Sequence, residues 1–257
     1  MPKHALRQNI LITGASSGLG EGMARAFAAK GRHLALCARR TERLDALKIE
    51  LERQYPQCKI WVKALDVNDA DAVFRVFSEF NAELDGIDRV IVNAGVGHGR
   101  KIGTGHFETN RRTAETNFVA ALAQCEAAME IFRQQNSGHL VTISSMSAIR
   151  GLPKHLTTYA ASKAALASLT EGILSEMQDS HSPINVTAIY PGYIHTDINK
   201  GAKNLPFVVS LEDGVAAMVK SIEKENARAY VPEWPWRAIG MAMTVLPLPL
   251  VKKLVGP

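Results

Sequence analysis

The sequence has little cysteine, few aromatic residues and no metal-binding motif. Its 257 residues include only three cysteines, Cys37, Cys58 and Cys125, and 6% of them are aromatic. An odd, widely spaced set of cysteines provides neither a complete disulfide framework nor a metal-ligand pattern. The eight histidines form no H-E-x-x-H motif and no paired cluster. We therefore expect no metal in this protein.

A secretion signal and a nucleic-acid-binding pattern are also missing. The first nine residues contain no hydrophobic signal region, which predicts a reducing, cytoplasmic location. The formal net charge is +5, but the basic residues are dispersed along the chain and form no stripe. We interpret this excess as a solvated basic surface that partly offsets the phosphates of a ligand, and we expect no nucleic-acid partner.

The apolar segments predict one α/β domain over residues 1–257. With 46% hydrophobic residues, the chain can bury a full core. Apolar strands alternate with helical stretches, which is typical of a Rossmann fold: a doubly wound parallel sheet with helices on both faces. The predicted strands are residues 9–13, 33–38, 59–65, 89–92, 139–144 and 184–190. Such sheets bind ligands at the carboxyl ends of their strands, so the site is expected there.

A glycine-rich turn, Thr13-Gly-Ala-Ser-Ser-Gly-Leu-Gly20, follows the first predicted strand and precedes a helix predicted over residues 21–30. Its G-x-x-x-G-x-G spacing differs from the G-x-G-x-x-G fingerprint. Outward N–H groups, the helix dipole and a close backbone approach would together suit a pyrophosphate. A glycine turn without a ligand is the alternative. The predicted phosphate-binding residues are Gly14, Ser16, Ser17, Gly18, Leu19 and Gly20.

Two arginines, Arg39 and Arg40, end the second predicted strand. An NAD site places an acidic residue near this point to bind the ribose 2′-hydroxyl, whereas basic residues suit a 2′-phosphate. Here Ala38 is neutral, and the planar guanidinium matches phosphate oxygens. The sequence therefore predicts NADP(H) in preference to NAD(H). Alternatively, the arginines only begin a solvated helix over residues 41–54, an interpretation that suits Arg40 better.

Tyr159 and Lys163 stand four residues apart in a helix predicted over residues 157–179. This spacing places both side chains on one face, one turn apart. A free phenol titrates near pKa ~10, and an ammonium beside it favours the phenolate. Lowering that pKa would make Tyr159 an effective general acid or base.

Taken together and in this order, these features resemble the short-chain dehydrogenase/reductase family over about residues 8–230. No single motif is specific, but their combination is. The shared stretches are Thr13-Gly-Ala-Ser-Ser-Gly-Leu-Gly20, Leu65-Asp-Val67, Asn93-Ala-Gly95, Asn117, Ile143-Ser-Ser145, Tyr159-Ala-Ala-Ser-Lys163 and Pro191-Gly192.

The resemblance implies a catalytic set of four residues. Tyr159 would exchange a proton with the substrate oxygen, and Lys163 would hold the nicotinamide ribose and lower the pKa of the tyrosine. Ser145 would orient the carbonyl, and Asn117, in a helix predicted over residues 108–135, would position a water that links Lys163 to solvent. Ser145 lies one residue farther from Tyr159 than is usual in the family, so two alternatives stay open, Ser144 and Ser147.

The resemblance also implies a chain of cofactor contacts. Asp66 would meet the adenine end, the turn that begins at Asn93 would support the cofactor beside the central strand, and Thr196 would bond the nicotinamide amide. Beyond the glycine turn, the predicted cofactor-binding residues are Arg39, Arg40, Asp66, Val67, Asn93, Ala94, Gly95, Tyr159, Lys163, Pro191, Gly192, Ile194 and Thr196.

Substrate recognition is expected in the loops around these motifs. Residues 193–211 are predicted to form a lid near the nicotinamide. The apolar C-terminal tail, residues 232–257, has three interpretations: a cover over the substrate cleft, a subunit contact, or an interfacial helix on a membrane. Family members that act on lipids and steroids carry comparable tails, which implies a hydrophobic ketone. The candidate substrate-binding residues are His98, Ser147, His155 and Tyr193.

The sequence thus predicts an NADP(H)-dependent oxidoreductase acting on a carbonyl or secondary alcohol, with a hydrophobic, lipid- or steroid-like ketone as the expected substrate. An NAD-dependent alcohol dehydrogenase of the same fold and a catalytically silent dinucleotide sensor are the alternatives. The family resemblance implies a homodimer or homotetramer formed through the helices over residues 108–135 and 157–179. The alanine-rich face of the second helix would permit close packing.

Overall fold

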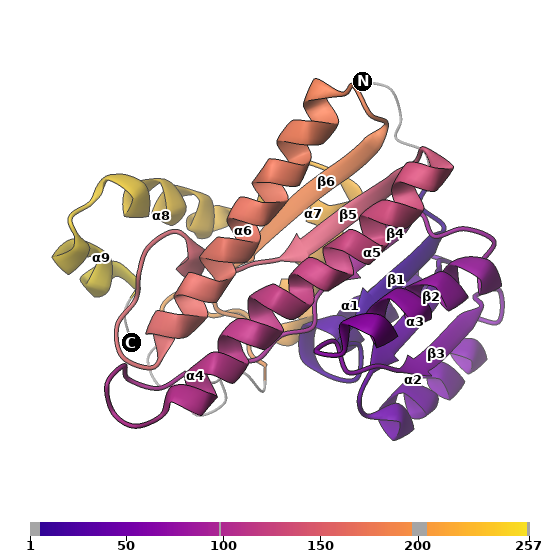
Figure 1. The fold of residues 1–257 in the computed structure, drawn as a ribbon, viewed down its shortest axis with the longest axis horizontal. Helices are drawn as coiled ribbons and strands as arrows, with labels where there is room; N and C mark the ends of the chain where they lie inside the picture. Colours follow the sequence, from indigo (N-terminus) through magenta and orange to yellow (C-terminus); the bar gives the residue numbers. More distant parts are fainter. Residues whose placement is uncertain (1–5, 98, 197–204, 256–257) are drawn as a thin grey trace.

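The computed structural model describes residues 6–97, 99–196 and 205–255 and contains one parallel sheet (Figure 1). Seven strands lie in the order β3-β2-β1-β4-β5-β6-β7, and all neighbours are parallel. This confirms the predicted doubly wound Rossmann fold. The strands are β1 (Asn9–Thr13), β2 (His33–Ala38), β3 (Ile60–Ala64), β4 (Arg89–Val92), β5 (Gly138–Ile143), β6 (Ile184–Pro191) and β7 (Arg228–Val231).

Helices cover both faces of the sheet, as Figure 1 shows. Successive residues of a strand point to opposite faces, so Ile10 and Ile12 of β1 pack in one core cluster while Leu11 packs in the other. The first cluster includes buried residues of α1 (Gly18–Ala28), α2 (Thr41–Gln54) and α7 (Leu211–Glu223). The second includes those of α3 (Ala70–Glu83), α5 (Ala120–Gln135) and α6 (Leu156–Asp179).

The strand order reverses between β1 and β4. The chain runs outward through β2 and β3 and then returns to pair β4 with the other edge of β1. Connections leave in opposite directions at such a switch point, and a crevice opens above the carboxyl ends of the two strands. The glycine turn follows β1 at this position, and the turn that begins at Asn93 follows β4.

The long helix predicted over residues 108–135 is interrupted. It comprises α4 (Phe107–Ala114), a π-helical turn (Glu115–Val119) and α5. The sequence analysis also omits β7, in which only Val231 is fully buried and Arg228 is exposed. That pattern lacks the continuous apolar run that identifies the other strands.

The C-terminal tail is packed into the fold through two helices, α8 (Glu233–Val245) and α9 (Leu248–Val255). Trp236, Met243 and Val251 are buried in a third apolar cluster that includes Met146, after β5, and Tyr190 of β6. Within the described ranges, no helix combines the length and apolar character required to cross a membrane.

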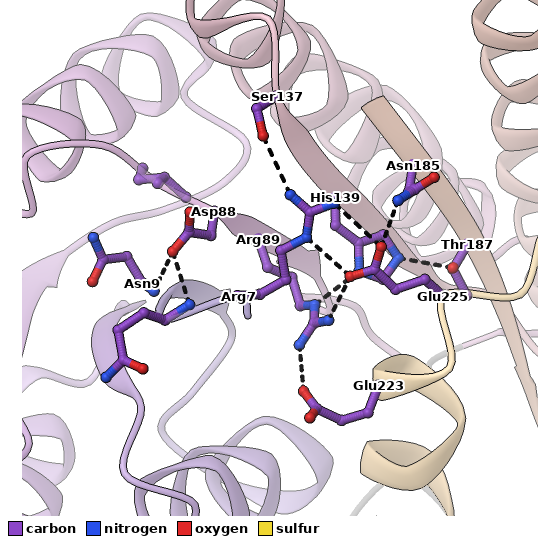
Figure 2. A network of polar contacts seen from close by, with 12 residues as sticks. Arg7, Asn9, Asp88, Arg89, Ser137, His139, Asn185, Thr187, Glu223 and Glu225 are labelled. Atoms are coloured by element: carbon purple, nitrogen blue, oxygen red, sulfur yellow. Dashed lines mark hydrogen bonds and ion pairs between the residues drawn. The ribbon is translucent and has the colours of Figure 1, made fainter. Parts of the chain in front are cut away.

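A network of buried charges joins the chain segments at the amino ends of the central strands (Figure 2). Arg7 donates to both carboxylate oxygens of Glu225 at 2.9 and 3.2 Å, and Arg89 donates to Glu225 at 3.1 Å and to Glu223 at 2.7 Å. The Nε of Arg89 donates to Nδ1 of His139 at 2.8 Å, so Nδ1 is an acceptor and that imidazole is neutral. These contacts tie β4 and β5 to the turn between α7 and β7.

Glu225 is the centre of this network, because its side chain is 1% exposed and contacts two arginines. Burial would raise the pKa of its carboxyl group, but the hydrogen bond and charge of Arg7, followed by the charge of Arg89, lower the pKa below the ordinary value of 4.5. A depressed pKa in the folded state contributes stability above the unfolded-state pKa. That contribution is lost as the pH falls through the folded pKa.

Glu225→Gln is therefore expected to destabilise the fold by about 3–5 kcal/mol, because it leaves buried guanidinium groups without their shared carboxylate. Urea unfolding at neutral pH measures the change. The control is Glu171→Gln, which removes a surface contact with Arg228 and should cost less than about 1 kcal/mol. The difference in the free energy of unfolding between wild type and Glu225→Gln should become smaller below pH 4.5, because protonation of Glu225 removes its charge in the wild type as well. Equal losses in both variants would contradict this account of the network.

Candidate active site

A cavity of about 610 Å³ gathers nearly all the predicted site residues along the carboxyl ends of the strands. Its volume lies within the range of ligand pockets, about 300–1,000 Å³. Every predicted catalytic, cofactor-binding and substrate-binding residue lines it, apart from three. Gly20 and Asn117 lie behind the wall, and His98 falls outside the described residues.

The glycine turn closes tightly over the end of β1. Gly14 and Gly18 have φ values of +65° and +56°, in the left-handed region that favours glycine. A Cβ on Gly20 would lie 2.4 Å from the carbonyl oxygen of Gly14, so Gly20 permits close packing of α1 on the turn. The helix begins at Gly18, three residues before the predicted start, which brings its first N–H groups to the cavity.

Thr13, which is not among the predicted site residues, links this turn to the next one. Its Oγ1 accepts hydrogen bonds from the backbone N–H groups of Asn93 at 3.0 Å and Ala94 at 3.1 Å. The Asn93 amide donates in return to the carbonyl oxygen of Thr13 at 2.8 Å. The residues that would support a cofactor beside the central strand are thus held against the glycine turn.

Arg40 folds back toward the glycine turn and does not simply extend into solvent. Its guanidinium donates to the hydroxyl groups of Ser17 at 2.7 Å and Ser16 at 3.1 Å. Arg39 lines the same end of the cavity, and Ala38 leaves that end of β2 without a carboxylate. Guanidinium and hydroxyl donors in this arrangement fit a phosphate group.

Tyr159 and Lys163 lie in the first two turns of α6, and Ser145 follows β5. The Ser145 hydroxyl lies close enough to the Tyr159 phenol to lower the pKa of that phenol. Both neighbouring serines have other contacts: the Ser144 hydroxyl donates to the carbonyl oxygen of Lys163 at 2.9 Å, and the Ser147 backbone N–H donates to Oγ of Ser145 at 3.2 Å. This geometry favours Ser145 over Ser144 as the residue that meets a substrate carbonyl, because the Ser144 hydroxyl is already engaged, while Ser147 stays an alternative.

Burial dominates the protonation equilibria of Tyr159 and Lys163. It raises the pKa of the Tyr159 phenol, the Ser145 hydroxyl opposes this, and Tyr193 adds to the increase. Lys163 is not among the groups that shift this pKa, and its ammonium donates to the carbonyl oxygen of Ile143 at 2.7 Å. The lowering of the Tyr159 pKa by Lys163 stays a prediction. Burial lowers the pKa of Lys163 to about 8.

Asn117 lies in the π-helical turn and is fully buried. Its side-chain oxygen accepts from the Val96 N–H at 2.8 Å, and its amide nitrogen donates to the Val96 carbonyl at 2.9 Å and to the Ser162 hydroxyl at 3.3 Å. A Cβ on Gly95 would lie 3.1 Å from the Asn117 oxygen and 3.5 Å from the Lys163 ammonium. The structure therefore brings Asn117 beside Lys163 and shows that it holds the turn after β4.

The C-terminal tail supplies part of the cavity wall, which the sequence analysis left among three interpretations. Trp236 and Met243 of α8 line the cavity, and the indole of Trp236 lies directly on Gly192. A Cβ at that glycine would lie 2.0 Å from the ring. Tyr193 and Phe207, at the two ends of the predicted lid, approach the indole edge-on at centroid distances of 5.6 and 6.2 Å. Two residues of the tail thus form part of the wall of the cleft.

Other cavity residues were also absent from the sequence prediction. Among them are the apolar residues Met146, Leu152, Leu156 and Leu205. The indole N–H of Trp236 and the hydroxyl of Ser147 are buried without a hydrogen-bond partner among the described residues. Across those residues, no group of three or more His, Cys, Asp or Glu side chains could hold a metal ion.

Gly192→Ala is expected to displace Trp236, because the added methyl group overlaps the indole ring. A displacement of about 1 Å at this wall should lower kcat/KM by about 10²-fold. The measurement is steady-state turnover together with tryptophan fluorescence. Gly151→Ala is the control, since a Cβ there meets nothing within 4 Å. Full activity of Gly192→Ala with an unchanged spectrum would contradict the contact.

The comparisons with known proteins agree with this site. The family model described as short chain dehydrogenase matches residues 8–205. An uncharacterized oxidoreductase of Mycobacterium tuberculosis is 51% identical over 96% of this chain and 97% of its own length. An uncharacterized oxidoreductase of Myxococcus xanthus is 35% identical over 93% of both chains. A short-chain type dehydrogenase/reductase from Mycobacterium marinum superimposes with a TM-score of 0.78 at 25% identity, covering 87% of this chain and 92% of that one.

The chain belongs to the short-chain dehydrogenase/reductase family. It is an oxidoreductase whose fold binds a nicotinamide dinucleotide. The groups in this chain that would hold such a cofactor are the left-handed glycines Gly14 and Gly18, the N-terminus of α1, and the side chains of Ser16, Ser17 and Arg40.

Proposed function

We propose that the protein is an NADP(H)-dependent reductase of an apolar carbonyl compound, reversible as a secondary-alcohol dehydrogenase. One observation carries the proposal: a single cavity joins the arginine pair after β2, the Ser145–Tyr159 pair near β5, and an apolar wall from α8. The strand order places these parts in that sequence along the sheet edge, so a dinucleotide bound across β1 and β4 would end beside Tyr159.

The nicotinamide would supply or accept the hydride, and the residues of this chain would manage the oxygen. The Tyr159 phenol would donate its proton to the substrate oxygen as the hydride reaches the carbon, while Ser145 would hydrogen bond the same oxygen. Burial raises the pKa of Tyr159, so the phenol carries at neutral pH the proton that a reduction requires. Lys163 would hold the ribose, and its ammonium would stabilise the negative charge that develops on Tyr159 as the phenol gives up its proton.

The cofactor preference rests on the end of β2. Arg40 contacts both Ser16 and Ser17, and Arg39 lies beside it, so this end of the cavity offers two cations and two hydroxyl groups. A ribose 2′-phosphate would use all of them, whereas a 2′-hydroxyl would lack the carboxylate that normally binds it. We therefore favour NADP(H) over NAD(H).

The substrate class follows from the wall near Tyr159. Leu152, Leu156, Trp236 and Met243 offer apolar contacts to a hydrophobic, lipid- or steroid-like ketone. The unpartnered groups of Trp236 and Ser147 favour a substrate that also carries a second oxygen, because that oxygen would relieve the cost of leaving them unbonded. His155 and Tyr193 line the same cavity and remain candidate contacts.

The segment 193–211 retains its proposed role as a lid. Ile194 pairs with Val209, and backbone hydrogen bonds join Val209 to Tyr193 and His195 to Val209, both at 3.0 Å. The base of the segment is therefore closed and fixed at the cavity edge. Its inner part, residues 197–204, lies outside the described residues.

We also propose a homodimer or homotetramer in the cytoplasm. Phe107 on α4 is 72% exposed and Val119 beside α5 is 57% exposed, so apolar side chains are present on the helices that the family uses for subunit contact. Burying them against a second copy would remove apolar surface from water.

Tyr159→Phe tests the reaction class, because it removes the proton donor and keeps the ring. NADPH oxidation, followed by absorbance with a panel of small and bulky carbonyl compounds, should fall by about 10²–10⁴-fold. Tyr55→Phe, a change at the end of α2 and away from the cavity, should retain wild-type rates. Equal rates in wild type and Tyr159→Phe would overturn the mechanism, and NADPH binding without any turnover would favour a dinucleotide sensor.

Arg40→Ala tests the cofactor assignment. Loss of one charged contact to a 2′-phosphate should weaken NADPH binding by about 10-fold or more and leave NADH binding nearly unchanged. Titration of both cofactors measures the difference. Arg43→Ala, an exposed charge change on the same helix α2, is the matched control. NADH binding at least as tight as NADPH in the wild type would instead identify an NAD-dependent alcohol dehydrogenase.

A further inference from the structure

Helix α8 carries apolar residues on both its buried and its exposed side, the exposed side also including Arg237 and Thr244. Its inner residues Trp236, Ile239 and Met243 are buried in the fold, yet the outer residues Met241 and Val245 are 64% and 79% exposed. A surface helix normally carries polar residues on the side that faces water. Exposed apolar residues that gather in one place usually mark an interaction surface.

The exposed apolar side chains continue at both ends of α8. Trp234, whose backbone is extended before the regular part of the helix, is 78% exposed, and Leu248 and Leu250 of α9 are 42% and 47% exposed. Figure 1 shows α8 and α9 projecting together from one end of the molecule. We call these residues the C-terminal surface: Trp234, Met241, Val245, Leu248 and Leu250.

Basic groups accompany this surface. Lys252 and Lys253 are exposed in the last turn of α9, and within the described part of the chain neither forms an ion pair. The Arg150 guanidinium donates to the carbonyl oxygens of Met243 and Thr244 at 3.3 and 3.4 Å, which adds a cation at the end of α8. From residue 234 to the last residue, the sequence contains no aspartate or glutamate.

We propose that the C-terminal surface docks the protein on an anionic lipid bilayer. An indole and aliphatic side chains enter the headgroup boundary, and lysines beside them attract acidic lipids. A second copy of the same surface is a poorer occupant, since a twofold contact would bring the same unneutralised cations toward each other. Charge complementarity therefore favours the membrane.

The position of the surface has a consequence for the reaction. Its outer residues lie on the same helix as Trp236 and Met243, which line the substrate cavity. A lipophilic substrate held in the bilayer would be close to that wall. This consequence rests on the proposed function, whereas the docking itself does not.

Vesicle flotation of the purified full-length chain tests the docking directly. Vesicles of phosphatidylcholine alone are compared with vesicles in which a third of the lipid is phosphatidylglycerol. Binding should be about tenfold stronger or more to the anionic vesicles and should weaken as salt is added. Because Trp236 is buried and Trp61 is partly buried, a blue shift of tryptophan fluorescence on binding should come from Trp234 and vanish in Trp234→Phe.

Paired variants separate the apolar and the ionic contributions. Met241→Glu/Val245→Glu should abolish flotation, while Ile49→Glu, at a residue that is 69% exposed on α2, should have no effect. Lys252→Glu/Lys253→Glu should weaken binding about tenfold or more. Lys30→Glu/Lys59→Glu, which changes the net charge equally at exposed positions outside the C-terminal surface, should weaken it far less.

Two results would overturn the proposal. One is equal binding, or no binding, to both vesicle types. The other is a wild type that does not bind vesicles but forms a dimer, which light scattering shows to be lost in Met241→Glu/Val245→Glu. That result would assign the surface to contact with a second copy. These experiments test the docking independently of the proposed reductase function. Tyr159→Phe should leave flotation unchanged, and the surface variants should still reduce a water-soluble carbonyl.

Discussion

The active site depends on the close approach of two loop backbones at the reversal of strand order. A Cβ on Gly14 would lie 2.9 Å from Cα of Ala94, and Thr13 and Asn93 hydrogen bond each other across the same gap. The contact leaves no room for a Cβ on Gly14, so the turns after β1 and β4 meet through their backbones and through the side chains of Thr13 and Asn93. A dinucleotide placed there meets N–H groups directly, and the flanking strands position the remaining residues relative to it.

Strands buried on both faces were the easiest elements to predict. Residues 9–13, 33–38 and 89–92 are predicted to the residue, because a parallel strand between two helix layers is a continuous apolar run with polar or glycine boundaries. The π-helical turn had no such signal. The sequence from Glu115 to Val119 contains neither glycine nor proline, and its conformation accompanies the contacts of the Asn117 amide with Val96, which lies 21 residues away.

The site residues likewise fall into two groups: those recognisable within one segment of the sequence, and those brought together only by the fold. Gly14, Tyr159 and Lys163 are recognisable because their spacing has a chemical reason within one segment, a strand-to-helix turn or one face of a helix. Trp236 has none: it covers Gly192 from a helix that follows two further elements, and only the three-dimensional fold brings them together. The pKa of Tyr159 is a similar case, since its direction depends on burial by residues that are remote in the sequence.

The sequence does not give the C-terminal tail a single interpretation, because α8 carries apolar residues on both its buried and its exposed side. A helix with apolar residues on opposite sides shows a weak 3.6-residue pattern, and the same composition then fits a cleft cover, a subunit contact or a membrane contact. The inner side of α8 packs against the active site, because the indole of Trp236 leaves no space for a Cβ on Gly192. Arg150 also holds the end of the helix. A partner that binds the outer side of α8 therefore contacts a helix whose inner side packs against the backbone of the active site. A shift of α8 on binding would change the shape of the substrate cavity.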